Sequence, residues 1–526
     1  MITARHRNTA LLVAGCYFME MLDGTIVTTA APQIGRSLHA PATQVGLIVT
    51  AYLLTLAVLI PLSGWLTRRI GNRTVFLTAI VIFTIASLGC AASVNLGMLV
   101  GMRVLQGVGG AMMVPVGRMM VLSPAAKEDI LRLTSYVVWP GLLAPVIAPL
   151  AGGLITTYAT WHWMFLINVP LGVVAFSVAW RVIAPGRPAD GVPPPLDWAG
   201  VVLTCAGLGA LAYTADLISQ SSPPGLETSL FAVAAAALLA AAVLHLRRAA
   251  HPLLNLRTLA VPTFRLAQSG VTLYWLVVGA MPFLMPLLFQ VQFGWSPMKS
   301  GAVVAFVFAG NVGIKPATTP LINRFGFRPV LIVSALGTTV FVTALGFTTA
   351  STPVPVIAAL ALASGATRSV GFTVYSTVGL TEMPAELMRD ANTLAATSMQ
   401  LAAGLAIAAA TVALRAGGAV TGAVPGTSTG QEAFTVAFCL LAFVSLGCVA
   451  GALRMARGAG DLARQPRAAA AAGRLAGSGP GPVPETRQRA PSQNTRRRGA
   501  RRAHGIALAT PVAQPVRCPL CNTGLR

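Results

Sequence analysis

Charged residues, and acidic residues above all, are scarce in this chain of 526 residues. Only 10% of the residues are charged, with 14 Asp and Glu against 37 Lys and Arg. Globular domains carry about 25% charged residues, so this composition excludes an ordinary water-soluble protein. Hydrophobic residues make up 55% of the chain, and the mean hydropathy is +0.72. These values favour a protein of the membrane.

Several patterns that carry chemistry are also missing. The sequence contains no G-x-x-x-x-G-K-[ST] loop, so we do not expect ATP to supply energy. It has no H-E-x-x-H motif and no acidic cluster at the end of an apolar stretch that would indicate an enzyme. The seven cysteines form no disulfide or metal framework. We therefore expect no metal, no cofactor and no enzymatic activity.

Fourteen apolar stretches, each about 20 residues long, fill the chain from Thr9 to Met455. A helix needs about 20 apolar residues to cross the ~30 Å hydrocarbon core of a bilayer. The loops between the stretches are too short to hold a soluble domain. The fold class predicted is therefore an all-α polytopic membrane protein with 14 transmembrane helices. The expected spans are residues 9–31, 44–66, 74–94, 96–122, 132–157, 163–184, 198–219, 228–248, 265–289, 299–322, 328–349, 353–379, 390–414 and 433–455.

Positive charge alternates between the loops. One set of loops carries eighteen Lys and Arg residues, whereas the other carries Arg36 and Lys299, with Arg415 at its edge. Positively charged loops remain in the cytoplasm, so this asymmetry predicts that both termini are cytoplasmic and that the number of spans is even. The abundance of Arg and Ala suggests a bacterial gene, and hence a multi-pass protein of the bacterial inner (plasma) membrane.

One loop pattern occurs twice. Residues 66–75 and 321–330 both fit L-x-x-R-x-G-x-R-x-V. Duplicated halves are typical of secondary transporters, which move one half against the other. We therefore expect two pseudo-symmetric six-helix bundles, residues 1–190 and 256–458, with an inserted two-helix hairpin at 191–255.

Residues 459–526 differ from the rest of the chain because Ala, Gly, Pro and Arg dominate them. Such a segment cannot bury enough apolar surface to fold, so we predict a disordered basic cytoplasmic tail. Its arginines could contact anionic lipid, but a solvated tail is favoured and no nucleic-acid partner is expected. Cys518 and Cys521 have the spacing of half a zinc ribbon, without the second pair that such a site requires.

Ionisable side chains inside membrane spans mark candidate sites, because burying a charge in a bilayer is unfavourable. The six found are Glu20, Asp23, Arg103, Arg118, Lys315 and Arg368. Glu20 and Asp23 share one face of the first span. Two carboxyls there should not both be ionised, which suits a proton acceptor. The alternative is that Asp23 only joins neighbouring helices by hydrogen bonds.

The remaining candidates leave similar alternatives open. Arg103 and Gln106 share a face of the fourth span, where the arginine could control a nearby carboxyl or serve as a static counter-ion. Lys315 and Arg368 give the C-terminal half cations without an intramembrane acid. They could bind an anionic or polar substrate group, or pair with backbone carbonyls. The fifth span could bend and pack closely, or only pack, through Pro145, Pro149, Gly152 and Gly153.

Five motifs in order resemble those of the fourteen-spanner drug:proton antiporters in the major facilitator superfamily. Residues 22–32 resemble the first-helix motif, and residues 64–73 resemble the cytoplasmic turn between helices two and three. Residues 103–110, 140–153 and 161–172 resemble the motifs of helices four, five and six. The residues matching the gating turn are Gly64, Arg69, Gly71 and Arg73. The chain departs from the family at Thr28, Arg68, Ala144 and Ala148, where Asn, Asp, Gly and Gly are usual.

The resemblance implies a multidrug efflux permease that exports small amphipathic compounds in exchange for protons by alternating access. Asp23, with or without Glu20, would take the proton, and Arg103 would tune it. The implied partners are a small-molecule substrate, protons and the lipid bilayer, while outer-membrane efflux partners stay open. The alternative is a proton-coupled exporter of one metabolite, such as an amino acid, a siderophore or a sugar.

Overall fold

The computed structural model of the chain describes residues 4–41, 44–122, 127–184, 195–220, 225–422 and 430–455. In this part of the chain all regular structure is helical, and thirteen helices are long and apolar enough to cross a membrane. One further pair of helices, bent by 49°, makes a fourteenth span if it is counted as one. The all-α polytopic fold class is confirmed.

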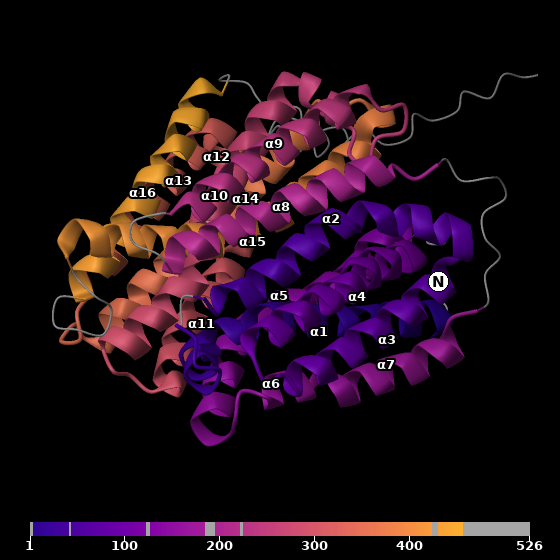
Figure 1. Cartoon of the computed structure of the whole chain (residues 1–526). Helices are drawn as coiled ribbons and strands as arrows, with labels where there is room; N and C mark the ends of the chain where they lie inside the picture. The colour runs from indigo at the N-terminus through magenta and orange to yellow at the C-terminus, as the bar shows by residue number, and fades with distance from the viewer. Residues whose placement is uncertain are drawn as a thin grey trace, which may run out of the picture. The chain divides into compact units, whose positions relative to one another are not determined.

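Seven helices form the N-terminal half, in indigo and purple in Figure 1. Within it, α1 packs against α5, and α4 packs against both α2 and α3. A buried apolar cluster that includes Phe76, Ile80 and Phe83 fills the space between these helices. The helices are α1 (Ala4–Ser37), α2 (Gly46–Ile70), α3 (Asn72–Ala91), α4 (Leu96–Leu122), α5 (Lys127–Tyr158), α6 (Trp163–Leu166) and α7 (Asn168–Val182).

The C-terminal half, in pink to yellow in Figure 1, is likewise built from helices that pack in pairs. Its α11 packs against α14, α13 against α16, and α10 against α15. The helices are α10 (Pro262–Leu287), α11 (Pro297–Gly313), α12 (Lys315–Phe325), α13 (Phe327–Gly346), α14 (Val354–Thr381), α15 (Met388–Thr421) and α16 (Gly430–Arg454). Three short helices complete it: η1 (Leu256–Ala260), η2 (Leu288–Gln292) and η3 (Ala385–Leu387).

The repeated loop pattern takes the same conformation in both halves. Gly71 between α2 and α3 has φ 85° and ψ 150°, and Gly326 between α12 and α13 has φ 86° and ψ 165°. This region of backbone space is essentially restricted to glycine. Two residues later, Arg73 donates to the carbonyl oxygen of Trp180 at 2.9 Å. Arg328 donates in the same way to that of Leu453 at 2.7 Å. Each turn is thus tied to the last turn of the last helix in its own half.

A two-helix hairpin, α8 (Trp198–Gln220) and α9 (Leu226–Arg248), separates the halves in sequence. The helices pack on each other, and α8 also contacts α2 and α15. Asp197 fixes the open end of the hairpin, because it pairs with His245 at 2.6 Å and accepts from the backbone N–H groups of Gly200 and Leu253. Burial raises the pKa of Asp197, but these hydrogen bonds and His245 outweigh it and hold the pKa below its usual range.

The single span expected over 299–322 is broken. α11 ends at Gly313 and α12 begins at Lys315, and the two are bent by 49°. Pro316 at the start of α12 explains the break, because proline has no N–H to continue the hydrogen bonding of α11. The sixth span, Trp163–Val182, has a one-residue interruption near its start, because α6 ends at Leu166 and α7 begins at Asn168.

The two halves contact each other at one end of the bundle, which we call the junction. Three contacts define it. Gln290 donates to the carbonyl oxygen of Thr29 at 2.9 Å, Thr50 donates to that of Gly404 at 3.2 Å, and Gly153 of α5 packs on Pro297 of α11. The junction involves the C-terminal parts of α1 and α5 and the N-terminal part of α2. It therefore lies toward the membrane face opposite the chain's N-terminus.

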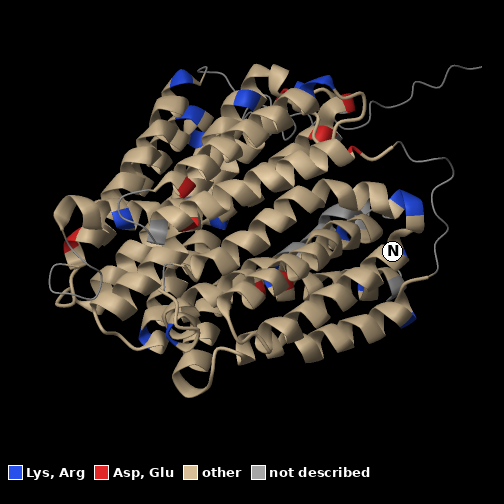
Figure 2. Cartoon of the chain, in the orientation of Figure 1, with Lys and Arg blue, Asp and Glu red and all other residues tan. Residues whose placement is uncertain are grey.

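Charged residues gather at the helix ends, but acidic and basic segments also lie together among the N-terminal helices (Figure 2). The tail predicted for 459–526, with Cys518 and Cys521, lies outside the described residues. The boundaries of the two bundles and the hairpin remain predictions.

Candidate functional site

Asp23 lies at the centre of a buried hydrogen-bonded network in the N-terminal half. Its Oδ2 atom accepts from Arg103 Nη1 at 2.5 Å. Its Oδ1 atom accepts from Asn168 Nδ2 at 2.7 Å and from Gln106 Nε2 at 3.1 Å. Asp23 is 1% exposed and Arg103 is fully buried. Helices α1, α4 and α7 therefore meet at one ion pair that has almost no contact with solvent.

Arg103 contacts aromatic rings as well as polar groups. Its Cζ atom lies 4.7 Å from the ring centre of Phe165 and 5.2 Å from that of Tyr52. Its Nη1 atom also donates to Gln106 Oε1 at 2.7 Å, and Gln106 donates to Ser87 Oγ at 2.8 Å. Ring faces attract a guanidinium most strongly where water is excluded. These contacts therefore hold the Arg103 side chain in one position.

Small residues after Arg103 let neighbouring helices approach α4 closely. A Cβ atom at Gly107 would lie 3.0 Å from the carbonyl oxygen of Tyr52, and one at Gly109 would lie 2.7 Å from the backbone N of Phe83. Membrane helices pack closely where such residues replace large side chains. The glycines therefore bring α2 and α3 against α4 and place Tyr52 beside the Asp23 network.

Glu20 lies about one helical turn from Asp23 but has different surroundings. It is 4% exposed, and its Oε2 atom has no hydrogen-bond partner. Arg118 of α4 interacts with it electrostatically and lies over the Tyr17 ring at 4.8 Å. Within the described part of the chain, Glu20 forms no ion pair of the Asp23–Arg103 kind. One face of α1 thus carries a fully hydrogen-bonded carboxylate and a carboxyl group with one unsatisfied oxygen.

The glycines predicted on α5 lie where this helix contacts both halves. A Cβ atom at Gly152 would lie 2.9 Å from the carbonyl oxygen of Ile26 in α1. One at Gly153 would lie 2.6 Å from the carbonyl oxygen of Pro297 at the start of α11. Adjacent glycines therefore let α5 pack closely on two sides at once. Two further predicted residues lie inside the same helix, Pro145 and Pro149.

The predicted gating residues do not belong to the Asp23 network. Arg69 lies over the ring of Trp65 at 5.4 Å, and a Cβ atom at Gly64 would meet no other atom within 4 Å. Gly71 and Arg73 form the repeated turn described above. These four residues lie toward the end of α2 that is farther from the junction.

Lys315 and Arg368 lie near each other in the C-terminal half, on α12 and α14. Neither is hydrogen-bonded to a member of the Asp23 network. Lys315 Nζ donates to Thr373 Oγ1 at 3.4 Å, and Arg368 Cζ lies between 5.3 and 5.5 Å from two aromatic ring centres. The predicted ionisable residues inside the spans therefore form two separate groups, one in each half.

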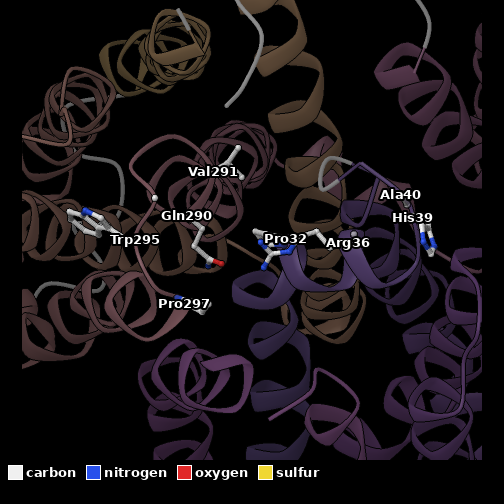
Figure 3. A pocket seen from close by; sticks show the side chains of 10 residues that line it. Pro32, Arg36, His39, Ala40, Gln290, Val291, Trp295 and Pro297 are labelled. Carbon is white, nitrogen blue, oxygen red and sulfur yellow. The ribbon is translucent and has the colours of Figure 1, made fainter. Parts of the chain in front are cut away.

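A hollow of about 760 Å³ lies at the junction. In Figure 3, residues of α1 and of the turn after it lie on one side of the hollow, and residues from η2 to the start of α11 lie on the other. The residues labelled there are Pro32, Arg36, His39, Ala40, Gln290, Val291, Trp295 and Pro297. None of them belongs to the Asp23 network, so the hollow is a feature of the junction rather than of the buried acid.

Four polar residues at or near these sites were not predicted as site residues, although Asn168 lies in the motif at 161–172. Asn168, Ser87 and Tyr52 complete the surroundings of Asp23 and Arg103. Asp216 is an acid inside α8 and is 8% exposed. Together with Thr50 and residues of α15 it lines a small hollow between α2, α8 and α15. The available signal was the presence of a polar side chain within an apolar stretch.

Across the residues that the structure describes, no group of His, Cys, Asp or Glu could hold a metal ion.

Sequence comparison gives consistent relatives. The model of the Major Facilitator Superfamily matches residues 13–407. The chain is 36% identical over 414 residues to the "Putative multidrug resistance protein MdtD" of Cronobacter sakazakii, which covers 77% of this chain and 86% of that protein. It is 35% identical over 438 residues to the protein of the same name from Escherichia coli O157:H7, covering 82% and 91%.

Structural comparison gives the same fold. A bacterial homologue of the human lysosomal transporter Spinster, in an inward-facing and occupied conformation, matches with a TM-score of 0.60 at 14% identity. The match covers 86% of this chain and 97% of that protein. At this identity the likeness concerns the fold alone. With the family match over most of its length, the chain belongs to the major facilitator superfamily of transporters.

Proposed function

We propose that the chain is a proton-coupled secondary transporter that exports small amphipathic drugs or toxic compounds across the bacterial inner membrane by alternating access. The observation that carries this proposal is the buried Asp23–Arg103 pair, in which Asp23 accepts three hydrogen bonds from side chains. When a buried acid that is paired with a cation takes up a proton, the cation loses its counter-ion. The names of the relatives from Cronobacter and Escherichia support a drug-like cargo.

The position of the junction supports alternating access. With both termini in the cytoplasm, as the loop charges favour, the junction lies toward the extracytoplasmic face. Thr29, Thr50 and Gly153 would then close the outer side of the transporter. Opening the junction and closing the opposite end would give the second state required for export.

Protonation of Asp23 would couple to that change through Arg103. A neutral Asp23 no longer compensates the guanidinium, and an unpaired charge in a low-dielectric interior is strongly unfavourable. Arg103 would have to move or find another acceptor, which changes how α4 packs on α1 and α7. A proton can shift the balance of two states only by binding one of them more tightly. The Asp23 network would supply this difference in proton affinity between the two states.

Glu20 would act with Asp23. Its Oε2 atom lacks a hydrogen-bond partner, so a proton there could be accommodated without breaking an existing bond. Asp23 would have to give up a hydrogen bond or its ion pair. We therefore assign Glu20 the role of first proton acceptor and Asp23 the role of the group that changes helix packing.

The experiment has two stages. Cells with and without the protein are first compared on a panel of amphipathic compounds, with and without a protonophore. Compounds to which the protein gives tolerance are then added to energised everted vesicles, where a pH-sensitive dye reports proton release. We expect Asp23→Asn to abolish compound-induced proton release. Glu432→Gln, which changes an exposed acid in the first turn of α16, should leave it unchanged.

Two results would overturn the proposal. One is that expression changes tolerance to no compound in the panel. The other is that export continues at the same rate when the proton gradient is collapsed or when Asp23 is replaced by asparagine.

A further inference from the structure

The C-terminal half contains two cations at the meeting point of four helices, α10, α11, α12 and α14. Arg368 of α14 has its Cζ atom 5.3 Å from the ring centre of Phe308 in α11 and 5.5 Å from that of Trp275 in α10. Lys315 begins α12, where the helix pair bends. Neither Arg368 nor Lys315 is fully buried. Each side chain therefore keeps some accessible surface, although the Nη1 atom of Arg368 is itself buried.

These cations lack a protein counter-ion. The sequence has no Asp or Glu between residues 262 and 381. In the described part of the chain, the ion pairs are Arg103–Asp23 and His245–Asp197, so neither Lys315 nor Arg368 is paired. A charge inside a membrane protein normally has a partner or marks a substrate path. The unpaired cations thus point to a missing anion.

Two buried donors at the same place have no acceptor. Arg368 Nη1 and Trp275 Nε1 are both without a hydrogen-bond partner. A buried donor without an acceptor is unfavourable, and buried polar groups are rarely left in this state. Arg103, by comparison, donates from both terminal nitrogens and lacks a partner only at Nε. Arg368 therefore has hydrogen-bonding capacity that the protein itself does not use.

The surrounding side chains specify what kind of anion would fit. The rings of Trp275, Phe308 and Phe372 provide flat apolar surface beside the two cations. An arginine binds a carboxylate through parallel N–H···O bonds, and a lysine adds a point charge. A cationic ligand would meet two like charges here. The geometry matches a single anionic group on an aromatic body.

The bend between α11 and α12 supports a binding role. Transporter binding sites often lie at discontinuous helices, where the N-terminus of a half-helix points its positive end at an anionic group. Lys315 is the first residue of α12, and Pro316 follows it. The half-helix end and the two side chains therefore contribute charge of the same sign.

We propose that Arg368 and Lys315, with the rings of Trp275 and Phe308, bind the anionic group of an aromatic organic acid. As an assignment of cargo class, this rests on the proposed export function. As a binding site, it stands without it.

The test compares three ligands that share one ring system: 2-naphthoate, 2-naphthamide and 2-naphthylmethylammonium. Their affinities for the purified full-length protein in detergent are measured by isothermal titration calorimetry. We expect 2-naphthoate to bind at least about tenfold more tightly than the amide, because a charge-assisted hydrogen bond adds that much affinity. The ammonium compound should bind most weakly.

Matched variants locate the site. Arg368→Gln should weaken 2-naphthoate binding about tenfold to a hundredfold and leave the amide unchanged. Arg368→Lys, which keeps the charge, should restore part of the loss. Arg265→Gln is the control, because it removes an exposed cation from the first turn of α10. Its affinity for 2-naphthoate should equal that of the wild type.

The wild-type comparison alone can overturn the proposal. Equal affinity for 2-naphthoate and 2-naphthamide, or no binding of 2-naphthoate, would contradict it even if a variant did not fold. Equal weakening by Arg265→Gln and Arg368→Gln would contradict it as well. Vesicle export separates this failure from failure of the proposed function. Proton-driven export without selective naphthoate binding would contradict only the proposed binding site. Selective naphthoate binding without export would contradict only the proposed transport function.

Discussion

In the N-terminal half, the buried arginine Arg103 is compensated by Asp23, and the pair is shielded from solvent. In the C-terminal half, the corresponding interior holds Lys315 and Arg368 without an acid. The two halves nevertheless share a fold and a repeated turn. The difference teaches that two halves with the same fold can differ in the charge balance of their interiors. The N-terminal half is internally neutral until a proton binds, whereas the C-terminal half lacks an anion.

The largest expected effect tests this contrast by removing one arginine from each half. Arg103→Gln leaves the Asp23 carboxylate without its cation, and breaking a buried pair costs about 3–5 kcal/mol of unfolding free energy. Arg368→Gln removes an uncompensated charge and should leave stability unchanged or higher. Reversible unfolding in mixed detergent micelles measures both changes.

A double variant provides the control for that experiment. Combining Asp23→Asn with Arg103→Gln removes both charges, so most of the stability lost in Arg103→Gln should return. Equal destabilisation by Arg103→Gln and Arg368→Gln would contradict the contrast between the halves.

The next largest effect on stability is expected at the repeated turn, which the two halves share. Gly71→Ala and Gly326→Ala each force alanine into a conformation that is nearly restricted to glycine, which costs about 1–3 kcal/mol. The two losses should agree, because the two turns have nearly the same dihedral angles. Gly64→Ala is the matched control, since its Cβ atom meets open space, and it should not destabilise. A loss at only one turn, measured by the same unfolding assay, would break the proposed equivalence.

A smaller effect is expected two residues farther on. Arg73→Gln and Arg328→Gln each remove a hydrogen bond to a backbone carbonyl oxygen at the end of the same half. Each should lower the unfolding free energy by about 0.5–1.5 kcal/mol. The two changes should add in the double variant, because the sites lie in different halves. Strong non-additivity would mean that the turns are coupled and the halves are not independent units.

The smallest effect belongs to the inserted hairpin. Its anchor Asp197 has a pKa below the usual value of 3.8. A lowered pKa in the folded state means that the stabilisation is present above the ordinary pKa and is lost as pH falls through the folded value. The unfolding temperature of the wild type should therefore decline in that acidic range more steeply than that of Asp197→Asn. Parallel pH profiles would show that Asp197 does not anchor the hairpin.

The sequence predicted the helical spans well because the requirement behind them is local. A backbone in lipid must satisfy its own hydrogen bonds, so about 20 consecutive apolar residues are sufficient evidence for a span. The break at Gly313–Pro316 also has a local cause, but proline is tolerated inside other helices here, such as α5 and α10. Its effect depends on packing, so the bend within the span expected at 299–322 could not be predicted from the proline alone.

The candidate site was only partly predictable. The cost of burying charge singled out Asp23, Arg103, Lys315 and Arg368 before any contact was known. Which charges pair with each other depends on helix packing, so Asp23 and Arg103, 80 residues apart, could not be matched by spacing. Asn168 was part of a recognised motif, but only the fold brings its amide to Asp23. The lack of an acid for Arg368 was predicted from the sequence, but its contacts with Trp275 and Phe308 depend on the fold.

The account depends most on the claim that protonation of Asp23 is coupled to ligand binding. The direct measurement is the net number of protons exchanged with the solvent when a transported compound is added to purified protein in weakly buffered detergent, repeated over a range of pH. We expect a net exchange at some pH from the wild type and from Glu432→Gln, and none at any pH from Asp23→Asn, with ligand affinity retained. Exchange from Asp23→Asn equal to that of the wild type at every pH would contradict the account.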